Sequence, residues 1–290
     1  MVNKIYFTIF LCLCCFCTIN AQVWPKYYGQ QNRREYAVDI IETYDKGYLI
    51  CGYYSSPDYT QRWGWLIKTD VNGEILWEKI LENTGSRFKP YAILQAQDGG
   101  ILICGTSRHA DKNMPIVLKL NACGEKQWCK LFDDSPNNES IAVDIKETET
   151  GNIVALVNLF GSIPQETIHL FKLSTDGEVL WRESFATTQN YPNTNLKLGR
   201  KLLITNDNKY LISGYGYWEQ PWNPGGPMPI TSLFIMVNSD GIEEWVLPFG
   251  LNEAILGIAE QAIKLNNSTY LGFVSYFTQG IVKPGFALFN

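Results

Sequence analysis

Short stretches rich in β-branched and aromatic residues alternate with turn residues along most of the chain. They recur in a fixed order. One set reads DKGYLICG, DGGILICG, TGNIVALV, NKYLISG and STYLGFV, and the next reads WLIKTDVNG, IVLKLNACG, HLFKLSTDG and LFIMVNSDG. Beyond the first 21 residues, no segment has a convincing helical period. The pattern therefore predicts repeated short strands bounded by tight turns.

One tryptophan marks each repeat at a constant register. The spacings are 53, 51, 53 and 64 residues between Trp24, Trp77, Trp128, Trp181 and Trp245. The last four tryptophans each follow a glycine by four positions, and three of those glycines stand in Asn-Gly or Asp-Gly pairs. These pairs favour hairpin turns because both residue types tolerate positive φ. A tryptophan at one position in every repeat indicates packing between neighbouring repeats, and not a cage for a ligand.

Four short strands in a unit of roughly 50 residues are typical of a β-propeller blade. The fifth unit ends at residue 290 with three strands, whereas VWPKYYG from Val23 is a fourth-type strand with no partners before it. Pairing the two would remove the free edge of the last blade. The sequence thus predicts an all-β fold: a five-bladed β-propeller of four-stranded antiparallel blades, with the N-terminal strand closing the last blade. The single domain spans residues 22–290, with blades at 36–81, 90–132, 141–186, 196–250, and 257–290 plus 22–28.

The first 21 residues are typical of a secretory signal peptide. Lys4 is their only charge, an apolar run extends from Ile5 to Ile19, and Ala21 precedes the expected cleavage point. The alternative is a membrane anchor, but the run is shorter than the roughly 20 residues that span a bilayer. We therefore expect a secreted, periplasmic or envelope-associated protein with no membrane span after cleavage.

The charge balance argues against nucleic acid as a partner. The chain has 24 Lys and Arg against 29 Asp and Glu, a net charge of −5, and its basic residues form no run. The electrostatic footprint that phosphate backbones require is therefore absent from the sequence.

Four cysteines follow the signal segment. Cys51 and Cys104 share one repeat position, each just before a glycine, and we interpret both as small core side chains. Cys123 and Cys129 flank one predicted turn. A disulfide between them would need their Cβ atoms about 4 Å apart, which simple hairpin register makes difficult, so the sequence leaves this pair open.

Little in the chain predicts metal or cofactor chemistry. His109 and His169 fall in different blades and at different positions, so we expect neither a shared metal site nor a cofactor. No Gly-x-Ser-x-Gly nucleophile motif is present. The segment from Asp70 to Glu74 has the composition of a calcium loop but is better explained as a hairpin turn.

Paired carboxylates are the serious catalytic alternative. Asp39 and Asp144 share one position on the first strand of their blades, and Glu42 and Glu147 follow three residues later. Glycoside hydrolases use two such groups, one as proton donor and one as nucleophile or base. Because these four residues follow the repeat instead of departing from it, a structural role is favoured.

The fourth repeat is longer than the others because YGYWEQPWNPGGPMP, from Tyr215, lies between its second and third strands. Exposed aromatic rings beside amides and a carboxylate suit a sugar face or an extended peptide. The alternative is a loop folded back as local core. Arg62 and Trp63 fall in the corresponding loop of the first repeat. The candidate ligand-binding residues are Tyr215, Tyr217, Trp218, Glu219, Trp222, Arg62 and Trp63.

The repeat pattern of the type DKGYLICG…WLIKTDVNG…W resembles the secreted propeller repeats of exported Bacteroidetes proteins, over residues 22–290. The resemblance implies the propeller architecture but no activity. The favoured hypothesis is an exported, non-catalytic binding propeller whose ligand is a glycan, a peptide or a protein surface. The alternatives are a glycan-active hydrolase with inner-strand carboxylates and an architectural component of an envelope assembly.

Overall fold

The computed structural model consists of β-strands and their connections in the part of the chain that it describes. The described residues are 25–31, 33–57, 61–81, 87–109, 112–132, 140–160, 167–185, 194–218, 230–249, 256–266, 268–278 and 281–290. The predicted signal peptide lies outside these ranges. Within them, no helix is long and apolar enough to cross a membrane.

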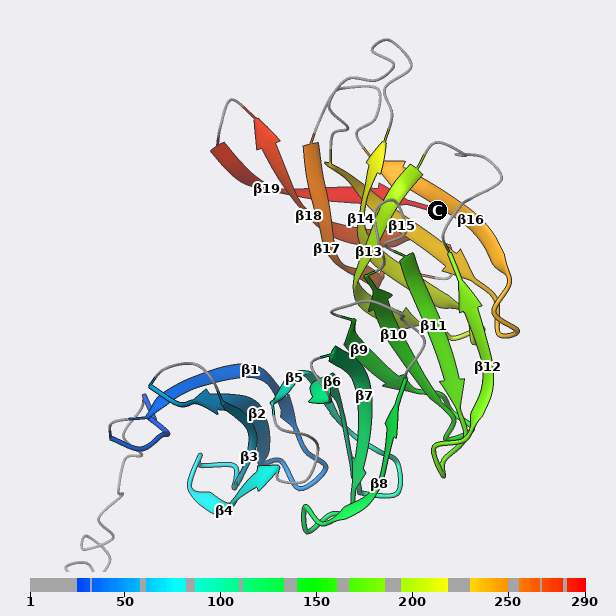
Figure 1. The fold of residues 1–290 in the computed structure, drawn as a ribbon. Helices are drawn as coiled ribbons and strands as arrows, with labels where there is room; N and C mark the ends of the chain where they lie inside the picture. The colour runs from blue at the N-terminus through cyan, green and yellow to red at the C-terminus, as the bar shows by residue number, and fades with distance from the viewer. Residues whose placement is uncertain are drawn as a thin grey trace, which may run out of the picture. The chain divides into compact units, whose positions relative to one another are not determined.

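The strands form five antiparallel sheets that follow one another in chain order (Figure 1). The first sheet contains β1 (Arg34–Glu42), β2 (Tyr48–Ser55), β3 (Arg62–Thr69) and β4 (Ile75–Leu81). The second contains β5 (Phe88–Gln95), β6 (Ile101–His109), β7 (Lys112–Leu120) and β8 (Lys126–Leu131). The third contains β9 (Ile141–Glu147), β10 (Ile153–Leu159), β11 (Thr167–Leu173) and β12 (Val179–Ser184). The fourth contains β13 (Thr194–Ile204), β14 (Tyr210–Trp218), β15 (Ile230–Val237) and β16 (Glu243–Phe249). The fifth contains β17 (Leu256–Lys264), β18 (Tyr270–Thr278) and β19 (Ile281–Phe289).

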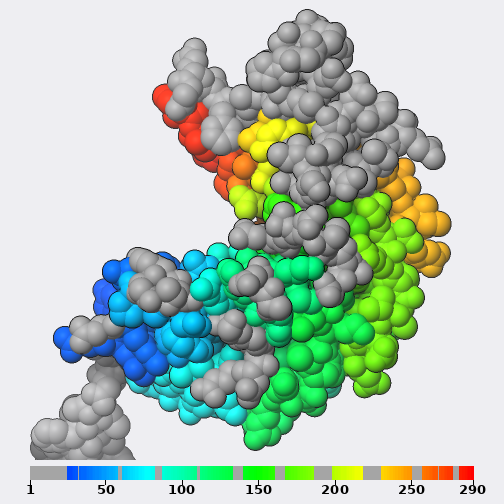
Figure 2. All heavy atoms as spheres, in the orientation of Figure 1, coloured from blue at the N-terminus to red at the C-terminus, as the bar shows by residue number. Residues whose placement is uncertain are grey.

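This arrangement confirms the all-β fold and the five repeats. In every sheet each strand pairs with its neighbour in sequence, and the fifth sheet has three strands where the others have four. In Figure 2 the colour of the described atoms runs from blue in the first sheet through green in the third to red in the fifth. A propeller is built from such sequential sheets, each one a blade.

Separate hydrophobic cores lie between successive sheets. Each of the four cores draws its buried residues from two neighbouring sheets. Cys51 belongs to the core between the first and second sheets, and Cys104 to the core between the second and third. Both thiols are buried and free, which confirms their interpretation as core side chains. Cys123 and Cys129 are exposed and are not bridged.

The repeated tryptophans pack on the turn of the next sheet. A Cβ added to Gly177 would lie 2.9 Å from the indole of Trp128, whose Nε1–H donates to the carbonyl oxygen of Thr175 at 3.0 Å. Gly177 also has φ of +82°, a conformation in which other side chains are strained. The indoles of Trp77 and Trp181 pack in the same way, 3.1 and 3.3 Å from a Cβ added to Gly124 and Gly241. The indole of one sheet can pack on the turn of the next only because the glycine there has no side chain. Tryptophan and glycine therefore recur together, as the packing interpretation predicted.

A lysine of the third strand is tied to the turn before the second strand in two sheets. Lys68 Nζ lies 2.9 Å from the carboxylate of Asp45, and Lys119 Nζ lies 2.9 Å from that of Asp98. Hydrogen bonds from the Thr43 hydroxyl and from Lys68 lower the pKa of Asp45 to about 2. These pairs explain why the repeat combines an Asp before its second strand with a Lys near the end of its third.

Strand β19 pairs only with β18 among the described strands, and residues 25–30 form no strand. Side chains on β19 are strongly exposed: Phe286 is 69% and Leu288 is 66% accessible. The predicted pairing of residues 22–28 with the last blade is therefore not part of the described sheet, and Trp24 lies outside the described residues.

Candidate functional site

The first strand of every sheet contains a β-bulge at one shared register. In each case the pairing with the second strand skips one residue, as between Ala37 and Asp39 in β1. A bulge leaves its extra residue unpaired and changes the direction of that side chain. The extra residues are Val38, Tyr91, Val143, Arg200 and Glu260.

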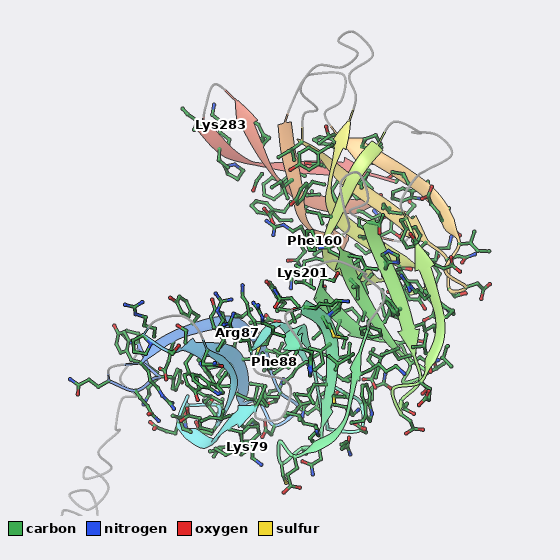
Figure 3. The ribbon with its side chains drawn as sticks, viewed as in Figure 1. Lys79, Arg87, Phe88, Phe160, Lys201 and Lys283 are labelled. Carbon is green, nitrogen blue, oxygen red and sulfur yellow. The ribbon has the colours of Figure 1, made fainter. Side chains whose placement is uncertain are left out.

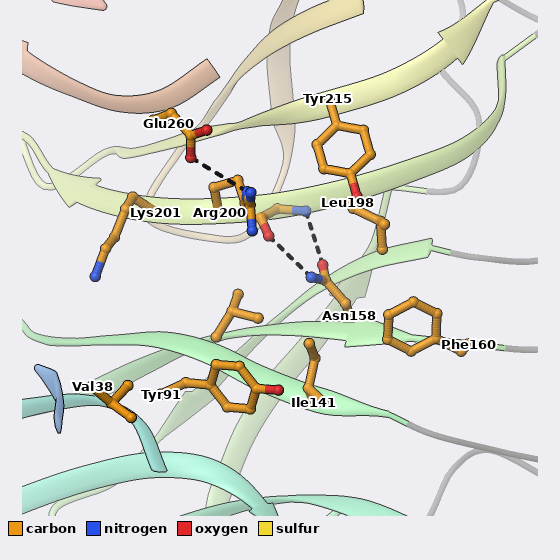
Figure 4. Close-up of a pocket in the computed structure, with 12 residues that line it drawn as sticks. Val38, Tyr91, Ile141, Asn158, Phe160, Leu198, Arg200, Lys201, Tyr215 and Glu260 are labelled. Atoms are coloured by element: carbon orange, nitrogen blue, oxygen red, sulfur yellow. Dashed lines mark hydrogen bonds and ion pairs between the residues drawn. The ribbon is translucent and has the colours of Figure 1, made fainter. Parts of the chain in front are cut away.

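All five bulge residues line one pocket of about 370 Å³ (Figure 4). This volume lies in the range of roughly 300–1,000 Å³ that is usual for small-molecule sites. The other lining residues are Ile141, Asn158, Phe160, Leu198, Gly199, Lys201 and Tyr215. The repeat thus supplies one side chain per sheet to a shared site, although the five side chains differ in chemistry.

The charged part of the pocket is an ion pair between two bulge residues. Arg200 Nε lies 3.5 Å from a carboxylate oxygen of Glu260, with side-chain exposures of 47% and 33%. The Arg200 guanidinium also lies 5.9 Å from the centre of the Tyr215 ring, a cation–π distance. Both partners line the pocket and remain partly exposed, so a ligand there can reach them.

Asn158 fixes the strand that carries Arg200. Its Nδ2 donates to the carbonyl oxygen of Gly199 at 3.0 Å, and its Oδ1 accepts the N–H of Gly199 at 2.9 Å. Both bonds are buried and join β10 to β13 across two sheets (Figure 4). A Cβ on Gly199 would lie 2.9 Å from the Leu156 side chain, so this close approach needs glycine. Asn158 therefore positions the bulge, and its amide is already used.

The first-strand aspartates join neighbouring sheets. Asp144 is 1% exposed, and its Oδ2 accepts the N–H of Leu202 in the fourth sheet at 2.8 Å. The Oδ2 of Asp39 accepts the N–H of Ile93 in the second sheet at 3.0 Å. Lys201 Nζ, beside the pocket, lies 3.7 Å from Asp144. The equivalent carboxylates thus bond equivalent backbone groups, as a structural role predicts.

The two repeated glutamates lie at turns. Glu42 pairs with Lys46 at 2.7 Å on the exposed surface, and Glu147 accepts the N–H of Gln97 at 2.7 Å. Neither residue lines the pocket. The four carboxylates considered for hydrolysis are therefore not gathered at this site.

The predicted aromatic residues of the fourth repeat belong partly to a strand. Tyr215, Tyr217 and Trp218 lie in β14, so assigning them to a loop between strands was wrong. Tyr215 lines the pocket, and its ring meets that of Tyr217 edge-on at 6.3 Å. The backbone of Trp218 pairs with Thr194. The other two predicted residues of this group, Glu219 and Trp222, lie outside the described residues.

Arg62 and Trp63 also open a strand, β3, and not a loop as predicted. Trp63 stacks on Tyr54 with ring centres 4.8 Å apart, and the Arg62 guanidinium lies 5.8 Å from the centre of the Tyr53 ring. Neither residue is among those that line the pocket.

The histidines lie apart from the pocket. His169 is buried in β11, where its Nε2 lies 2.6 Å from the Thr167 hydroxyl and its Nδ1 accepts from Arg182 Nε at 3.4 Å. His109 Nε2 lies 3.2 Å from the Ser107 hydroxyl. Among the described residues, no group of three or more His, Cys, Asp or Glu side chains is arranged to hold a metal ion.

Sequence reasoning missed most of the pocket. Tyr91, Arg200 and Glu260 were not predicted, although each stands immediately before the repeat position of Asp39. The position before it holds four residue types among the five repeats, but the Asp39 position itself holds four as well. Variation between repeats therefore did not distinguish the bulge residues from their neighbours.

Comparison with known proteins supports the fold alone. No protein-family model and no curated protein matches the chain. A Dyadobacter fermentans protein of unknown function is similar at a TM-score of 0.52 and 13% identity, over 86% of this chain and 74% of that one. An ulvan lyase from a new polysaccharide lyase family gives a TM-score of 0.55 and 8% identity, over 86% of this chain and 66% of the lyase. The same enzyme bound to -[GlcA(1-4)Rha3S]- gives a TM-score of 0.55 and 8% identity, over 91% of this chain and 69% of the lyase.

Proposed function

We propose that this chain is an exported β-propeller that binds a carbohydrate in the bulge-lined pocket without transforming it. The observation that carries the proposal is the convergence of five bulge residues, one from each sheet, on one pocket. Tyr91 and Tyr215 provide ring surface for the C–H face of a sugar. Arg200 and Glu260 provide a donor and an acceptor for its hydroxyl groups. This combination of apolar surface and a few directed polar groups is typical of ligand sites.

Binding is favoured over hydrolysis by the carboxylates of the pocket. Hydrolysis requires two carboxyl groups on either side of the bond that breaks. Among the described lining residues, Glu260 is the only Asp or Glu, and it is paired with Arg200. Asp39 and Asp144 are engaged by backbone N–H groups instead. The solved lyase complex holds a saccharide on a similar fold, which is compatible with either role.

The test is binding to a printed array of glycans, followed by calorimetry with the glycans that bind. We expect Tyr91→Ala and Arg200→Gln to weaken binding by at least tenfold while melting like the parent protein. Tyr44→Ala is the matched control, because Tyr44 is 65% exposed and lies outside the pocket. Equal binding by parent and pocket variants would contradict the site. Mass spectrometry of the glycan after incubation tests whether the protein leaves it intact, since shortened products would contradict a non-catalytic role.

We also propose that residues 22–28 supply the fourth strand of the fifth sheet. The support is the strand-like sequence VWPKYYG with its repeat-type Trp24, together with an outer edge of β19 that pairs with none of the described strands. Free edges are usually covered or paired in native sheets. Such pairing would close a five-bladed ring and join the two ends of the domain.

Export and the Bacteroidetes-type repeat family are proposals from the sequence alone. Expression of the full chain in a bacterium, followed by mass measurement of the exported protein, tests cleavage after Ala21. An exported protein that begins at Gln22 is the expected result. A full-length chain retained with the membranes would contradict it.

A further inference from the structure

A strip of basic and aromatic side chains lies beside the pocket, on the first and second sheets. We define this basic–aromatic strip as Tyr36, Tyr53, Arg62, Arg87 and Lys89. The rings of Tyr36 and Tyr53 stack with centres 4.8 Å apart and an angle of 17° between their planes. Arg62 lies 5.8 Å and Lys89 lies 5.5 Å from the centre of the Tyr53 ring.

Lys89 joins the strip to the pocket. Its Nζ lies 4.6 Å from the centre of the Tyr91 ring, and Tyr91 is the bulge residue that lines the pocket from the second sheet. The rings remain partly accessible, and Tyr36 is 41% exposed. A ligand that extended out of the pocket past Tyr91 would therefore meet Lys89 and the stacked tyrosines next.

Two arginines of the strip are direct neighbours. Arg62 and Arg87 are partners in an isolated parallel β-bridge between the first two sheets, and Figure 3 labels Arg87 beside Phe88. Within the described residues, no carboxylate lies at ion-pair distance from Arg62, Arg87 or Lys89. The chain as a whole has a net charge of −5, so this local excess of positive charge is unusual for it.

We infer that the basic–aromatic strip is a second subsite that binds the acidic groups of a glycan whose neighbouring sugar occupies the pocket. This inference rests on the proposed function and specifies its substrate class as a saccharide bearing carboxylate or sulfate groups. The bridged backbones of Arg62 and Arg87 allow both guanidinium groups to bind one acidic group. Their planar donors match carboxylate and sulfate oxygens in pairs.

The chemistry of the strip favours an acidic glycan over other anionic polymers. Its cations alternate with tyrosine rings, and a sugar has both an apolar face for a ring and acidic groups for a cation. Three basic residues also fall short of the long positive stripe that a phosphate backbone requires. An acidic peptide would satisfy the arginines but would not use the rings of Tyr53 and Tyr91, both of which lie near Lys89.

The experiment is an array of acidic polysaccharides, each printed beside its own neutralised form. Uronic acid polymers are paired with their carboxyl-reduced forms, and sulfated polymers with their desulfated forms. We expect at least one acidic polymer to bind the parent protein tenfold or more tightly than its neutral partner. This preference should shrink between 50 and 300 mM NaCl because salt screens partly exposed charges.

Variants then assign the preference to the strip. Arg62→Gln and Arg87→Gln are each expected to weaken binding of the acidic form by about tenfold, the size of one charged hydrogen bond. They should change binding of the neutral form by less than twofold. Lys126→Gln is the control, because it removes an exposed positive charge on β8, away from the strip.

The outcomes separate the two proposals. Equal binding of acidic and neutral forms, abolished by Tyr91→Ala, would overturn the strip assignment and leave the carbohydrate pocket intact. Absence of binding to every polysaccharide would overturn both. Binding of hexaglutamate as tightly as the best acidic glycan, with the same dependence on Arg62 and Arg87, would overturn the glycan assignment in favour of an acidic peptide.

Discussion

The carboxylate of Asp144 in β9 accepts the backbone N–H of Leu202 in β13, with 2.8 Å between oxygen and nitrogen. Asp39 in β1 bonds Ile93 in β5 in the same way, at 3.0 Å. At these two junctions the first strand of one sheet thus holds the first strand of the next through a polar contact. Because these strands carry the bulge residues, the contact also sets the geometry of the pocket.

We expect Asp144→Ala to destabilise the protein by about 3 kcal/mol, because the substitution leaves the buried Leu202 N–H without its acceptor. Lys146 and Lys201, at 3.3 and 3.7 Å from Asp144, would also lose their carboxylate partner. Asp39→Ala should cost less, since its carboxylate is more accessible. Urea unfolding followed by tryptophan fluorescence measures the stability of both variants. A variant of normal stability that lost activity on a glycan would instead indicate catalysis by Asp144.

Acid should weaken the protein through His169. Burial, and next the nearby Arg182, lower the pKa of His169 to about 4 from an ordinary 6.5. The unfolded chain therefore takes up its proton at a higher pH than the folded one, so stability falls as the pH decreases from about 6.5 to about 4. The full effect is about 3 kcal/mol. Unfolding free energies at pH 7.5 and 5.0 should differ less in His169→Gln than in the parent, and an equal difference would contradict a neutral buried histidine.

The repeat, the sheets and the hairpin turns could be predicted because they depend on local sequence. Trp128 and Gly177 are 49 residues apart, yet their recurrence revealed a contact between sheets. The burial of Cys51 could be predicted for the same reason, since Cys104 repeats its position. Such features occur in several repeats at the same position, and this recurrence makes them recognisable in the sequence.

The pocket could not be predicted in the same way. Whether Arg200 points into a pocket depends on the pairing slip between Gly199 and Lys201, and that slip is fixed by β14 and by the Asn158 contact. A strand with strict alternation would direct the Arg200 side chain elsewhere. The residues from Tyr215 onward were assigned to a loop because the fourth repeat is longer than the others and the excess falls there. Cross-strand pairing nevertheless keeps Tyr215 and Tyr217 in β14.

The pair of Lys119 and Asp98 should contribute little to stability. Lys119 is buried, but the Asp98 side chain is 59% exposed, and desolvation offsets much of the attraction. The fourth repeat has Met236 at the equivalent position. We therefore expect the double variant Lys119→Met with Asp98→Asn to lie within about 1 kcal/mol of the parent in urea unfolding. A loss above 3 kcal/mol would assign the pair a structural role that Met236 cannot share.

Removal of residues 22–28 tests the closure of the last blade. If these residues pair with β19, a protein that starts at residue 29 should lose about 2 kcal/mol or more, because a strand of backbone hydrogen bonds and the packing of Trp24 are lost. Melting temperature and resistance to protease are the measurements. A chain that starts at residue 22 is the control, and identical behaviour of the two would contradict closure.

The outer face of the fifth sheet provides an independent test. Phe286 pairs across the strands with Phe273, as Phe234 pairs with Ser213 one sheet earlier, yet Phe286 is 69% exposed and Phe234 is fully buried. In every other sheet this face packs against the next sheet. A closed ring would cover it with the first sheet, where Ile40 is 58% exposed.

Closure therefore predicts that Phe286→Ser costs about 1–3 kcal/mol, as for a buried side chain. Replacement of an exposed apolar residue by Ser should cost at most about 0.5 kcal/mol. Leu180→Ser on the outer strand β12 is the control, because Leu180 is 52% exposed. If the first sheet covers Phe286, Ile40→Ser and Phe286→Ser should also couple by more than about 0.5 kcal/mol in a double-mutant cycle, since distant sites add independently. Additive effects no larger than that of Leu180→Ser would mean that the two faces do not meet.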